Sequence, residues 1–317
     1  MTVIYVREWL NWLALILSVF SLPTFAQNVA TDRLLRQSML ALEYANYLGA
    51  FTYEFGGGID AVEVAYHVDE GVGHHVIKNL NGKPGKLERH NPVQVCPSVG
   101  SILFGGGSIQ TRNGPLSLHD NYNLAVVGRD RIADRSAWVM EAVPRDGFRY
   151  GVSLTLDEKT GLPLRVMMMN RSNVAIERLQ FVSLDVSDQT ADARADVLRK
   201  LPCEPGNLAP AILPELIPDW LPRGFVLAQH ELDARQRSVA TYTDGIASFT
   251  LFMHRAAPAE LKRKGLARRG ATLALLSTVA FEEEGAVGEG VPWQIALVGE
   301  VPAVTAKQVV ASLRKAQ

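Results

Sequence analysis

The sequence predicts an α+β protein: an open antiparallel β-barrel wrapped on a helix, followed by a smaller α+β domain. Three observations support this class. Short segments with alternating apolar residues follow one another at close spacing. Few stretches have helical periodicity, and a proline-rich stretch divides the chain. Closely spaced strands with short connections fit an antiparallel sheet better than an alternating parallel fold.

The composition is that of a globular protein with room for two domains. The chain has 317 residues, of which 47% are hydrophobic and 21% are charged. The formal net charge is -1. Because non-specific nucleic-acid binding depends on an excess of positive charge, we expect no nucleic-acid partner.

Residues 1–26 have the pattern of a secretory signal peptide. Arg7 precedes an apolar run, residues 9–20, and small residues precede a cleavage site expected after Ala26. The alternative is an uncleaved anchor, but Asn11 and Pro23 interrupt the run, which is short for a span of about 20 residues. We therefore expect a mature protein that is soluble in an exported compartment.

The first domain is expected at residues 27–190 and begins with a helix. Thr31 or Asp32 can cap this helix, apolar residues at helical spacing follow to about Tyr47, and Gly49 is expected to end it. This helix is the predicted cover of the sheet. Strands are then expected at residues 51–55, 62–66, 76–80, 88–96, 109–112 and 137–143.

Residues 148–186 are predicted to form three consecutive antiparallel strands. Apolar side chains alternate with small or polar ones from Tyr150 to Leu156 and again from Leu162 to Met168. In the third strand the apolar phase changes near Phe181. A β-bulge there, or burial of both faces, explains this change.

Residues 191–218 are predicted to be a stiff linker, because six of the 16 prolines lie between Pro202 and Pro222. The second domain is expected at residues 219–317. Its final helix is predicted to be capped by Thr305, with Val309 and Leu313 on the inner face. Its strands are expected at residues 224–230, 238–243, 246–254, 272–281 and 292–300.

Two cysteines, Cys96 and Cys203, remain in the mature chain. In an oxidising compartment they can form a disulfide, and they can equally remain two separate buried thiols. The sequence leaves both alternatives open.

The histidines of the first domain resemble a metal site only superficially. His67, His74, His75 and His90 lie near Cys96, but His74 and His75 are adjacent. In a strand, adjacent side chains leave opposite faces, so these two cannot easily bind one ion. We expect no metal.

The sequence contains no complete catalytic motif. Ser98 lies in half of a nucleophile-elbow motif, but the first glycine is missing and the strand-to-helix turn does not fit. Residues 105–108 are glycine-rich without a following lysine, so a loop is the simpler interpretation. A hydrolase built on Ser98 is the enzymatic alternative, and we expect no cofactor.

Two groups of side chains are candidates for binding apolar or anionic ligands. Methionines at 167–169 beside the aromatic strand 51–55 can line a flexible apolar pocket, although core packing explains them as well. Arginines near a short helix expected between Pro258 and Gly265 can meet phosphorylated headgroups or an acidic partner, although such a run is usually a solvated face. The pocket candidates are Phe51, Tyr53, Leu154, Leu164 and Met168, and the headgroup candidates are Arg263, Arg268 and Arg269.

Several segments, in the same order along the chain, resemble the RseB and MucB family of periplasmic regulators of the envelope-stress sigma factor. They are NYLGAFTY at 46–53 with Gly56-Gly57, LDEKTGLPLR at 156–165, LPRGF at 221–225, YTDGIA at 242–247, GAT at 270–272 and VGEVP at 298–302. Together they span almost the whole mature chain.

The resemblance implies a periplasmic protein with a LolA/LolB-like open barrel, helices across its mouth and a small carboxy-terminal domain. It implies binding to the periplasmic part of a single-span anti-sigma factor, which is shielded from proteolysis until lipid, lipopolysaccharide or lipoprotein in the barrel releases it. The resemblance does not imply any enzymatic activity. It leaves open whether the protein forms a homo-oligomer. The alternative is a lipid or lipoprotein carrier.

For the partner surface we expect Trp220, Phe225 and Tyr242, because large aromatic residues commonly anchor interfaces. The same three side chains can instead form the core of the second domain. Which of the two holds depends on whether the fold leaves them exposed.

Overall fold

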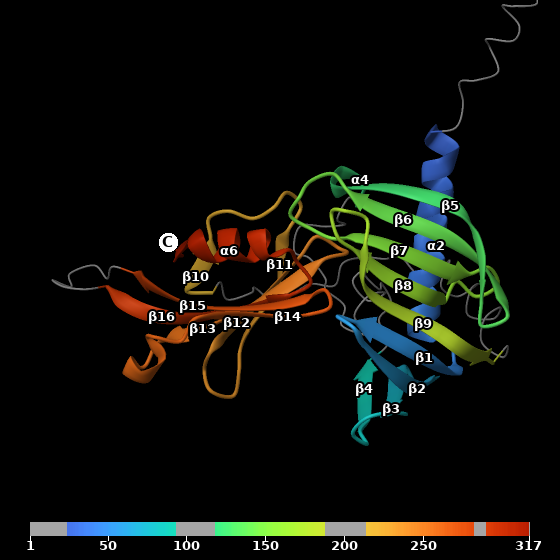
Figure 1. Ribbon diagram of the computed structural model, residues 1–317, viewed down its shortest axis with the longest axis horizontal. Helices are drawn as coiled ribbons and strands as arrows, with labels where there is room; N and C mark the ends of the chain where they lie inside the picture. The colour runs from blue at the N-terminus through green and yellow to red at the C-terminus, as the bar shows by residue number, and fades with distance from the viewer. Residues whose placement is uncertain (1–23, 93–117, 188–213, 282–289, 317) are drawn as a thin grey trace, which may run out of the picture.

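The computed structural model describes residues 24–92, 118–187, 214–281 and 290–316 (Figure 1). Two open antiparallel sheets organise these residues, and three helices of four or more residues accompany them. The prediction of open antiparallel sheets with few helices is confirmed. In the described part of the chain, no helix is both long and apolar enough to cross a membrane.

The first sheet has nine strands in the order β4-β3-β2-β1-β9-β8-β7-β6-β5, with every pair antiparallel. Its strands are β1 Tyr47–Phe55, β2 Gly58–Asp69, β3 Val72–Asn79, β4 Lys86–Pro92, β5 Tyr122–Ile132, β6 Arg135–Pro144, β7 Gly151–Asp157, β8 Pro163–Met169 and β9 Ala175–Val186. A short helix, α4 Leu118–Asn121, precedes β5. The sheet does not close, because β4 and β5 remain its edges.

Helix α2, Thr24–Tyr44, runs across this sheet (Figure 1). Leu35 packs in a buried cluster with side chains of β5, β6 and β7, such as Tyr122, Met140 and Leu154. The burial of each large apolar side chain stabilises the packing of the helix on the sheet by about 1.5–3 kcal/mol. The helix ends earlier than predicted, and Tyr47 and Gly49 belong to β1 instead.

Gly49 serves strand pairing and not helix termination. A Cβ at this position would lie 2.6 Å from the Ser183 carbonyl oxygen and 2.9 Å from a ring carbon of Phe181. The pairing of β1 with β9 skips Val182, since Ala50 pairs with Ser183 and Phe51 pairs with Phe181. The bulge predicted near Phe181 is therefore confirmed.

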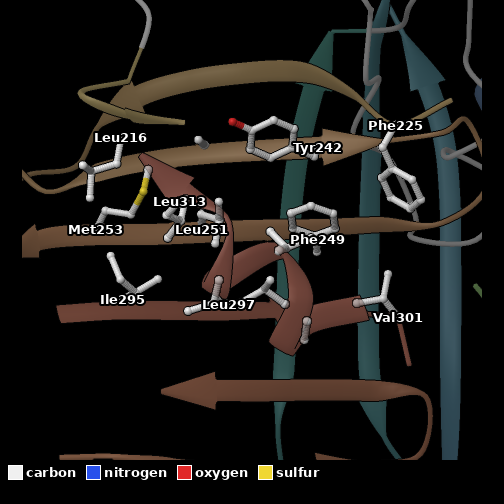
Figure 2. Close-up of a cluster of buried hydrophobic side chains, with 14 of the residues drawn as sticks. Leu216, Phe225, Tyr242, Phe249, Leu251, Met253, Ile295, Leu297, Val301 and Leu313 are labelled. Atoms are coloured by element: carbon white, nitrogen blue, oxygen red, sulfur yellow. The ribbon is translucent and has the colours of Figure 1, made fainter. Parts of the chain in front are cut away.

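The second sheet has six strands in the order β11-β12-β13-β16-β15-β14, all antiparallel. They are β11 Val226–Leu232, β12 Ser238–Thr243, β13 Ser248–Arg255, β14 Gly265–Arg269, β15 Thr272–Phe281 and β16 Val291–Gly299. Helix α6, Ala303–Ala311, packs on β15 and β16. Figure 2 shows the core between them, with Phe249, Leu251 and Leu297 at its centre.

A small two-stranded ribbon closes the second unit. Strand β10, Leu216–Pro218, pairs with β17, Leu313–Lys315. Residues 216–218, expected at the end of the linker, thus form part of this fold, while the rest of the proline-rich stretch up to residue 213 lies outside the described residues. Leu313, expected in the final helix, lies in β17, and Thr305 lies inside α6, whose N-cap is Pro302 without a side-chain cap.

Candidate functional site

A cavity of about 400 Å³ lies on the inner side of the first sheet, within the usual range for ligand pockets. Its walls come from strands β1, β2, β3, β8 and β9, and Leu42 of α2 contributes to them. The carboxy-terminal unit adds Thr272 and Glu300. The apolar lining includes Phe51, Ile77, Val166, Met168, Leu179, Phe181 and Leu184.

Three of the five predicted pocket residues line this cavity, namely Phe51, Tyr53 and Met168. The prediction was wrong for the other two, which are core residues. Leu154 packs beneath α2, and Leu164 is 0% exposed in a cluster with Ile132 and Ala137. Both sides of the sheet at β7 and β8 are covered, so alternation alone could not distinguish cavity wall from core.

The cavity has an acidic end where the two units meet. Glu177 of β9 accepts a hydrogen bond from the Ala271 amide at 2.8 Å and one from the Tyr53 hydroxyl. Glu300, which follows β16, accepts a weak hydrogen bond from the Thr272 hydroxyl at 3.4 Å. Burial and the Tyr53–Glu177 hydrogen bond raise the pKa of Tyr53, so this residue acts as a neutral donor.

Glu300 is the most perturbed carboxyl group at this end. Its pKa is raised to about 7: burial is the largest cause and the nearby charge of Glu177 adds to it, while hydrogen bonds from a backbone amide and from the Thr272 and Ser248 hydroxyls act in the opposite direction. Neither glutamate was predicted from the sequence. A signal existed for Glu177, which shares the alternation phase of Leu179 and Phe181 and therefore points to the same face.

The histidines behave as adjacent strand residues should. The His74 ring stacks on the His67 ring, with 4.7 Å between the ring centroids. The His75 ring packs on the Tyr66 ring, with 4.3 Å between the centroids, and lines the cavity. Their side chains leave opposite faces of β3, as expected. Among the described residues, no group of three or more potential ligands is placed to hold a metal ion.

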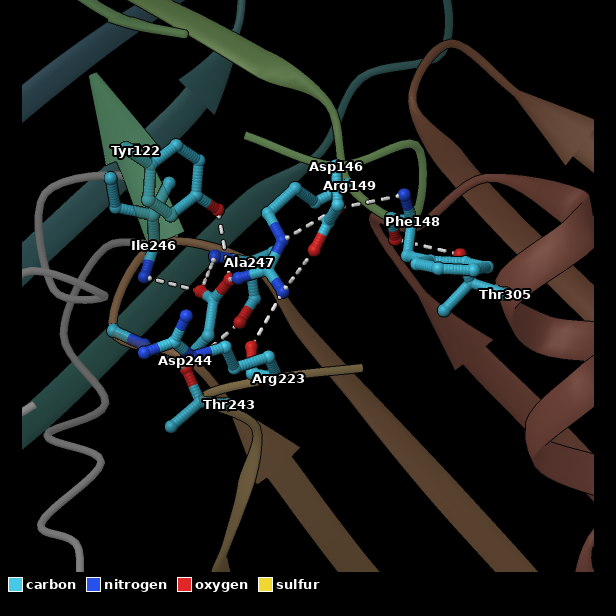
Figure 3. A network of polar contacts seen from close by, with 11 residues as sticks. Tyr122, Asp146, Phe148, Arg149, Arg223, Thr243, Asp244, Ile246, Ala247 and Thr305 are labelled. Carbon is cyan, nitrogen blue, oxygen red and sulfur yellow. Dashed lines mark hydrogen bonds and ion pairs between the residues drawn. The ribbon is translucent and has the colours of Figure 1, made fainter. Parts of the chain in front are cut away.

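A buried ion pair joins the two units next to the cavity-bearing sheet (Figure 3). Arg149 of the first unit pairs with Asp244 in the β12–β13 turn of the second, and their side chains are fully buried. Asp244 also accepts hydrogen bonds from the Tyr122 hydroxyl at 2.9 Å and from the Ile246 and Ala247 amides at 2.9 and 2.8 Å. Four donors on two oxygens fit the ionised carboxylate.

Arg149 has further partners on both units. It donates to the Asp146 carboxylate at 2.9 Å and to the Arg223 carbonyl oxygen at 2.6 Å. Burial is the largest single effect and lowers the pKa of Arg149, but the combined effects of Asp244, Tyr122 and Asp146 outweigh it, so the pKa rises above its ordinary value. In the same turn, Ile246 packs into the cluster under α2, so this turn is anchored by both charge and apolar burial.

A second contact between the units lies beside the acidic end of the cavity. Arg269 forms an ion pair with Asp60 at 3.1 Å and lies over the Phe55 ring at 4.0 Å. Arg268 lies over the Tyr150 ring at 5.7 Å. Gly270, with φ of +59°, approaches so closely that a Cβ would lie 2.6 Å from the Glu177 carboxylate.

The headgroup candidates Arg263, Arg268 and Arg269 are all exposed but have different neighbours. Arg268 and Arg269 contact the first unit at the junction, whereas Arg263 lies away from it, so headgroup binding by the three together stays a prediction. The predicted helix between Pro258 and Gly265 is a single turn of 3-10 helix, Pro258–Glu260. The arginines at 268 and 269 belong to β14 instead.

The predicted partner-binding aromatics also lie elsewhere than expected. Phe225 and Tyr242 are 5% and 3% exposed and pack around Phe249, so they form the core of the second unit and offer no free surface (Figure 2). Trp220 is partly buried and packs edge-on against Phe148 of the first unit at 5.0 Å. Cys96, Cys203 and Ser98 lie outside the described residues.

Comparison with known proteins matches both units to one family. Residues 30–200 match the MucB/RseB N-terminal domain, and residues 215–314 match the MucB/RseB C-terminal domain. The sigma factor AlgU regulatory protein MucB of Pseudomonas aeruginosa is 29% identical over 318 residues, covering 95% of this chain and 96% of the relative. The sigma-E factor regulatory protein RseB of Haemophilus influenzae is 25% identical over 306 residues, covering 91% and 92%.

Solved structures agree with this match. MucB in complex with MucA(peri) superimposes with a TM-score of 0.66 at 27% identity, covering 90% of this chain and 99% of that chain. The P. aeruginosa MucA/MucB complex gives a TM-score of 0.65 at 25% identity, covering 91% and 99%. Two of the segments on which the resemblance is based lie at the junction of the two units: residues 242–247 contain Asp244, the partner of Arg149, and residues 270–272 contain Ala271, the donor to Glu177. The chain belongs to the MucB/RseB family.

Proposed function

We propose that this protein is a periplasmic negative regulator of an envelope-stress sigma factor, acting by binding the periplasmic part of a single-span anti-sigma factor. The observation that carries the proposal is the match along almost the whole chain to MucB, which has been solved in complex with MucA(peri). While bound, the regulator shields the anti-sigma factor from proteolysis. It acts by binding and not by turnover.

The domain organisation that we propose follows from the same match. A LolA/LolB-like half-barrel domain covered by helices occupies residues 27–190, a linker occupies 191–218, and a partner-binding domain occupies 219–317. The family matches at 30–200 and 215–314 support this division. The ion pair of Arg149 with Asp244 holds the two domains in one arrangement, so a partner can contact both at once.

We place the partner at the edge of the junction, around Trp220. This side chain is only partly buried and lies between Phe148 and the second core. Tryptophan at such a position contributes strongly to many interfaces because it offers a large, rigid contact area. Phe225 and Tyr242 contribute indirectly, by supporting the core behind it.

The test measures protection of the partner from its protease. The periplasmic domain of the anti-sigma factor from the same genome is mixed with its protease and increasing amounts of mature regulator. We expect cleavage to stop at saturation, and Trp220→Ala to weaken binding by about tenfold or more, which corresponds to 1.4 kcal/mol. Trp138→Ala, a partly exposed tryptophan under Arg129 on β6, is the matched control. Unchanged cleavage at saturating regulator would refute the proposal.

The cavity supports a second function, the binding of a lipid or lipoprotein acyl chain, either as the signal that releases the partner or as the cargo of a carrier. The supporting observation is an apolar space of about 400 Å³. Organic extraction followed by mass spectrometry should recover an apolar ligand from the purified protein. Val166→Trp, which fills the cavity, should abolish recovery, whereas Val182→Trp on the exposed bulge should not. A ligand-free extract from the unmodified protein would argue against this function.

A further inference from the structure

The charges around the cavity are one-sided. Its described lining contains no lysine or arginine, and its ionisable members are Tyr47, Tyr53, His75, Glu177 and Glu300. The nearest cation at the acidic end, Arg269, is paired with Asp60 and lies over Phe55. The two glutamates therefore have no unpaired positive neighbour among the described residues of this end.

The glutamates come from different units and share one end of the cavity. Glu177 is held by the Ala271 amide and the Tyr53 hydroxyl, so its orientation is fixed. The described donors to Glu300 are all neutral: a backbone amide and the hydroxyls of Thr272 and Ser248, of which the Thr272 contact is long at 3.4 Å. A buried carboxylate without a cation is costly, so this end accepts a proton or a positively charged group.

We propose that the cavity binds a single-chain amphiphile with a primary ammonium head, the chain lying among Phe51, Met168 and Phe181 and the ammonium lying between Glu177 and Glu300. The proposal rests on the apolar-ligand function proposed above for this cavity. Charge complementarity selects this occupant. An alkyl carboxylate would bring a third negative charge to the same end, and a neutral alcohol would leave the glutamate charges uncompensated.

The proposal also predicts a pH dependence. The raised pKa of Glu300, about 7, means that this group is neutral at pH 6 and ionised at pH 8. The groups around Glu300 and Glu177 at the acidic end are Tyr53 on β1, Ser248 on β13, Arg269 on β14 and Thr272 on β15. His75 on β3 lines the same cavity. An alkylammonium ion should therefore bind more tightly as the pH rises from 6 to 8.

The experiment compares three probes with the same chain: decylammonium, decan-1-ol and decanoate, each below its micelle concentration. Binding to the mature full-length protein is measured by isothermal titration calorimetry at pH 8. We expect decylammonium to bind at least about tenfold more tightly than decanoate, since the ammonium donates charge-assisted hydrogen bonds to the glutamates whereas the carboxylate is repelled by them. Glu300→Gln should remove most of this preference and the pH dependence, while affinity for decan-1-ol stays within about threefold.

Glu231→Gln, at an exposed position on β11 outside the cavity, is the matched control and should leave all three affinities unchanged. Equal affinity for the three probes would overturn the ammonium proposal while leaving an apolar-ligand cavity in place. No binding of any probe would overturn both, and neither outcome bears on protection of the anti-sigma factor. Circular dichroism of each variant verifies that the fold is retained.

Discussion

Replacement of Arg149 by methionine should loosen the junction between the two domains. Methionine approximates the aliphatic part of the arginine and leaves the Asp244 carboxylate buried without its cation. The carboxylate keeps the Tyr122 hydroxyl and the two amides of its own turn, but these are neutral donors. Removal of one partner of a buried pair costs about 3–5 kcal/mol.

Replacement of the other partner should cost less. In Asp244→Asn the retained side-chain oxygen can still accept the Ile246 and Ala247 amides, because both bind the same oxygen, Oδ1. Arg149 keeps the partly exposed Asp146 carboxylate and the Arg223 carbonyl oxygen. We therefore expect Arg149→Met to be more destabilising than Asp244→Asn, and the double variant to cost less than the sum of the two.

Amide hydrogen exchange at Ile246 and Ala247 measures this effect locally. Loss of about 3 kcal/mol should increase exchange there more than about 100-fold, because each 1.4 kcal/mol is a factor of ten. The loss should shrink at acidic pH, where the isolated Asp244 carboxyl can bind a proton. Exchange within threefold of the unmodified protein in Arg149→Met, or strictly additive single variants, would refute the reasoning.

Three further perturbations test the junction, the acidic end of the cavity and the core. Gly270→Ala should weaken the contact between the domains by about 1–3 kcal/mol, because alanine is strained at this φ and its Cβ would meet Glu177. Faster hydrogen exchange of the Ala271 amide would report this weakening. Gly265→Ala is the control, because a Cβ at that position meets nothing within 4 Å. Glu300 has a folded-state pKa of about 7, above its ordinary value of 4.5, so the folded state binds more protons and stability falls as the pH rises between these values. Relative to Glu300→Gln, the unmodified protein should lose about 2–3 kcal/mol of unfolding free energy from pH 5 to pH 8 in urea titrations, and parallel curves for the two proteins would contradict this. Leu164→Ala should lower the free energy of unfolding by about 2–5 kcal/mol, while Val182→Ala on the exposed bulge should change it by less than about 0.5 kcal/mol; similar urea midpoints for the two would show that Leu164 does not carry core packing.

Most strands were predictable because alternation records the pleat directly. The predicted strands at 238–243 and 272–281 agree with β12 and β15, and the bulge at Phe181 was visible as a change of apolar phase. Strand β5 was missed. Its register shifts between Val126 and Gly128, and the polar run that follows is largely exposed, so the period of two does not persist.

The cavity was predicted in part. Aromatic and methionine side chains on neighbouring strands fitted either an apolar pocket or core packing, and three of the five pocket candidates line the cavity. The acidic end was not predicted, because Glu177 and Glu300 lie 123 positions apart by their numbers and come together only through domain docking. Glu177 had one local signal, the alternation phase that it shares with Leu179 and Phe181, but nothing local distinguishes Glu300 from the many glutamates that face solvent.

By itself, the sequence determined the antiparallel sheets, the division of the chain into two parts and the family resemblance, because these depend on side-chain period, proline placement and local motifs. Only the tertiary structure decided which of the candidate residues are buried and which contact the other domain. Phe225 and Tyr242 became core, and Arg268 and Arg269 became contacts between domains. A local pattern fixes the face from which a side chain leaves its strand, but burial and pairing depend on what packs against that face, and here the covering element comes from the other domain.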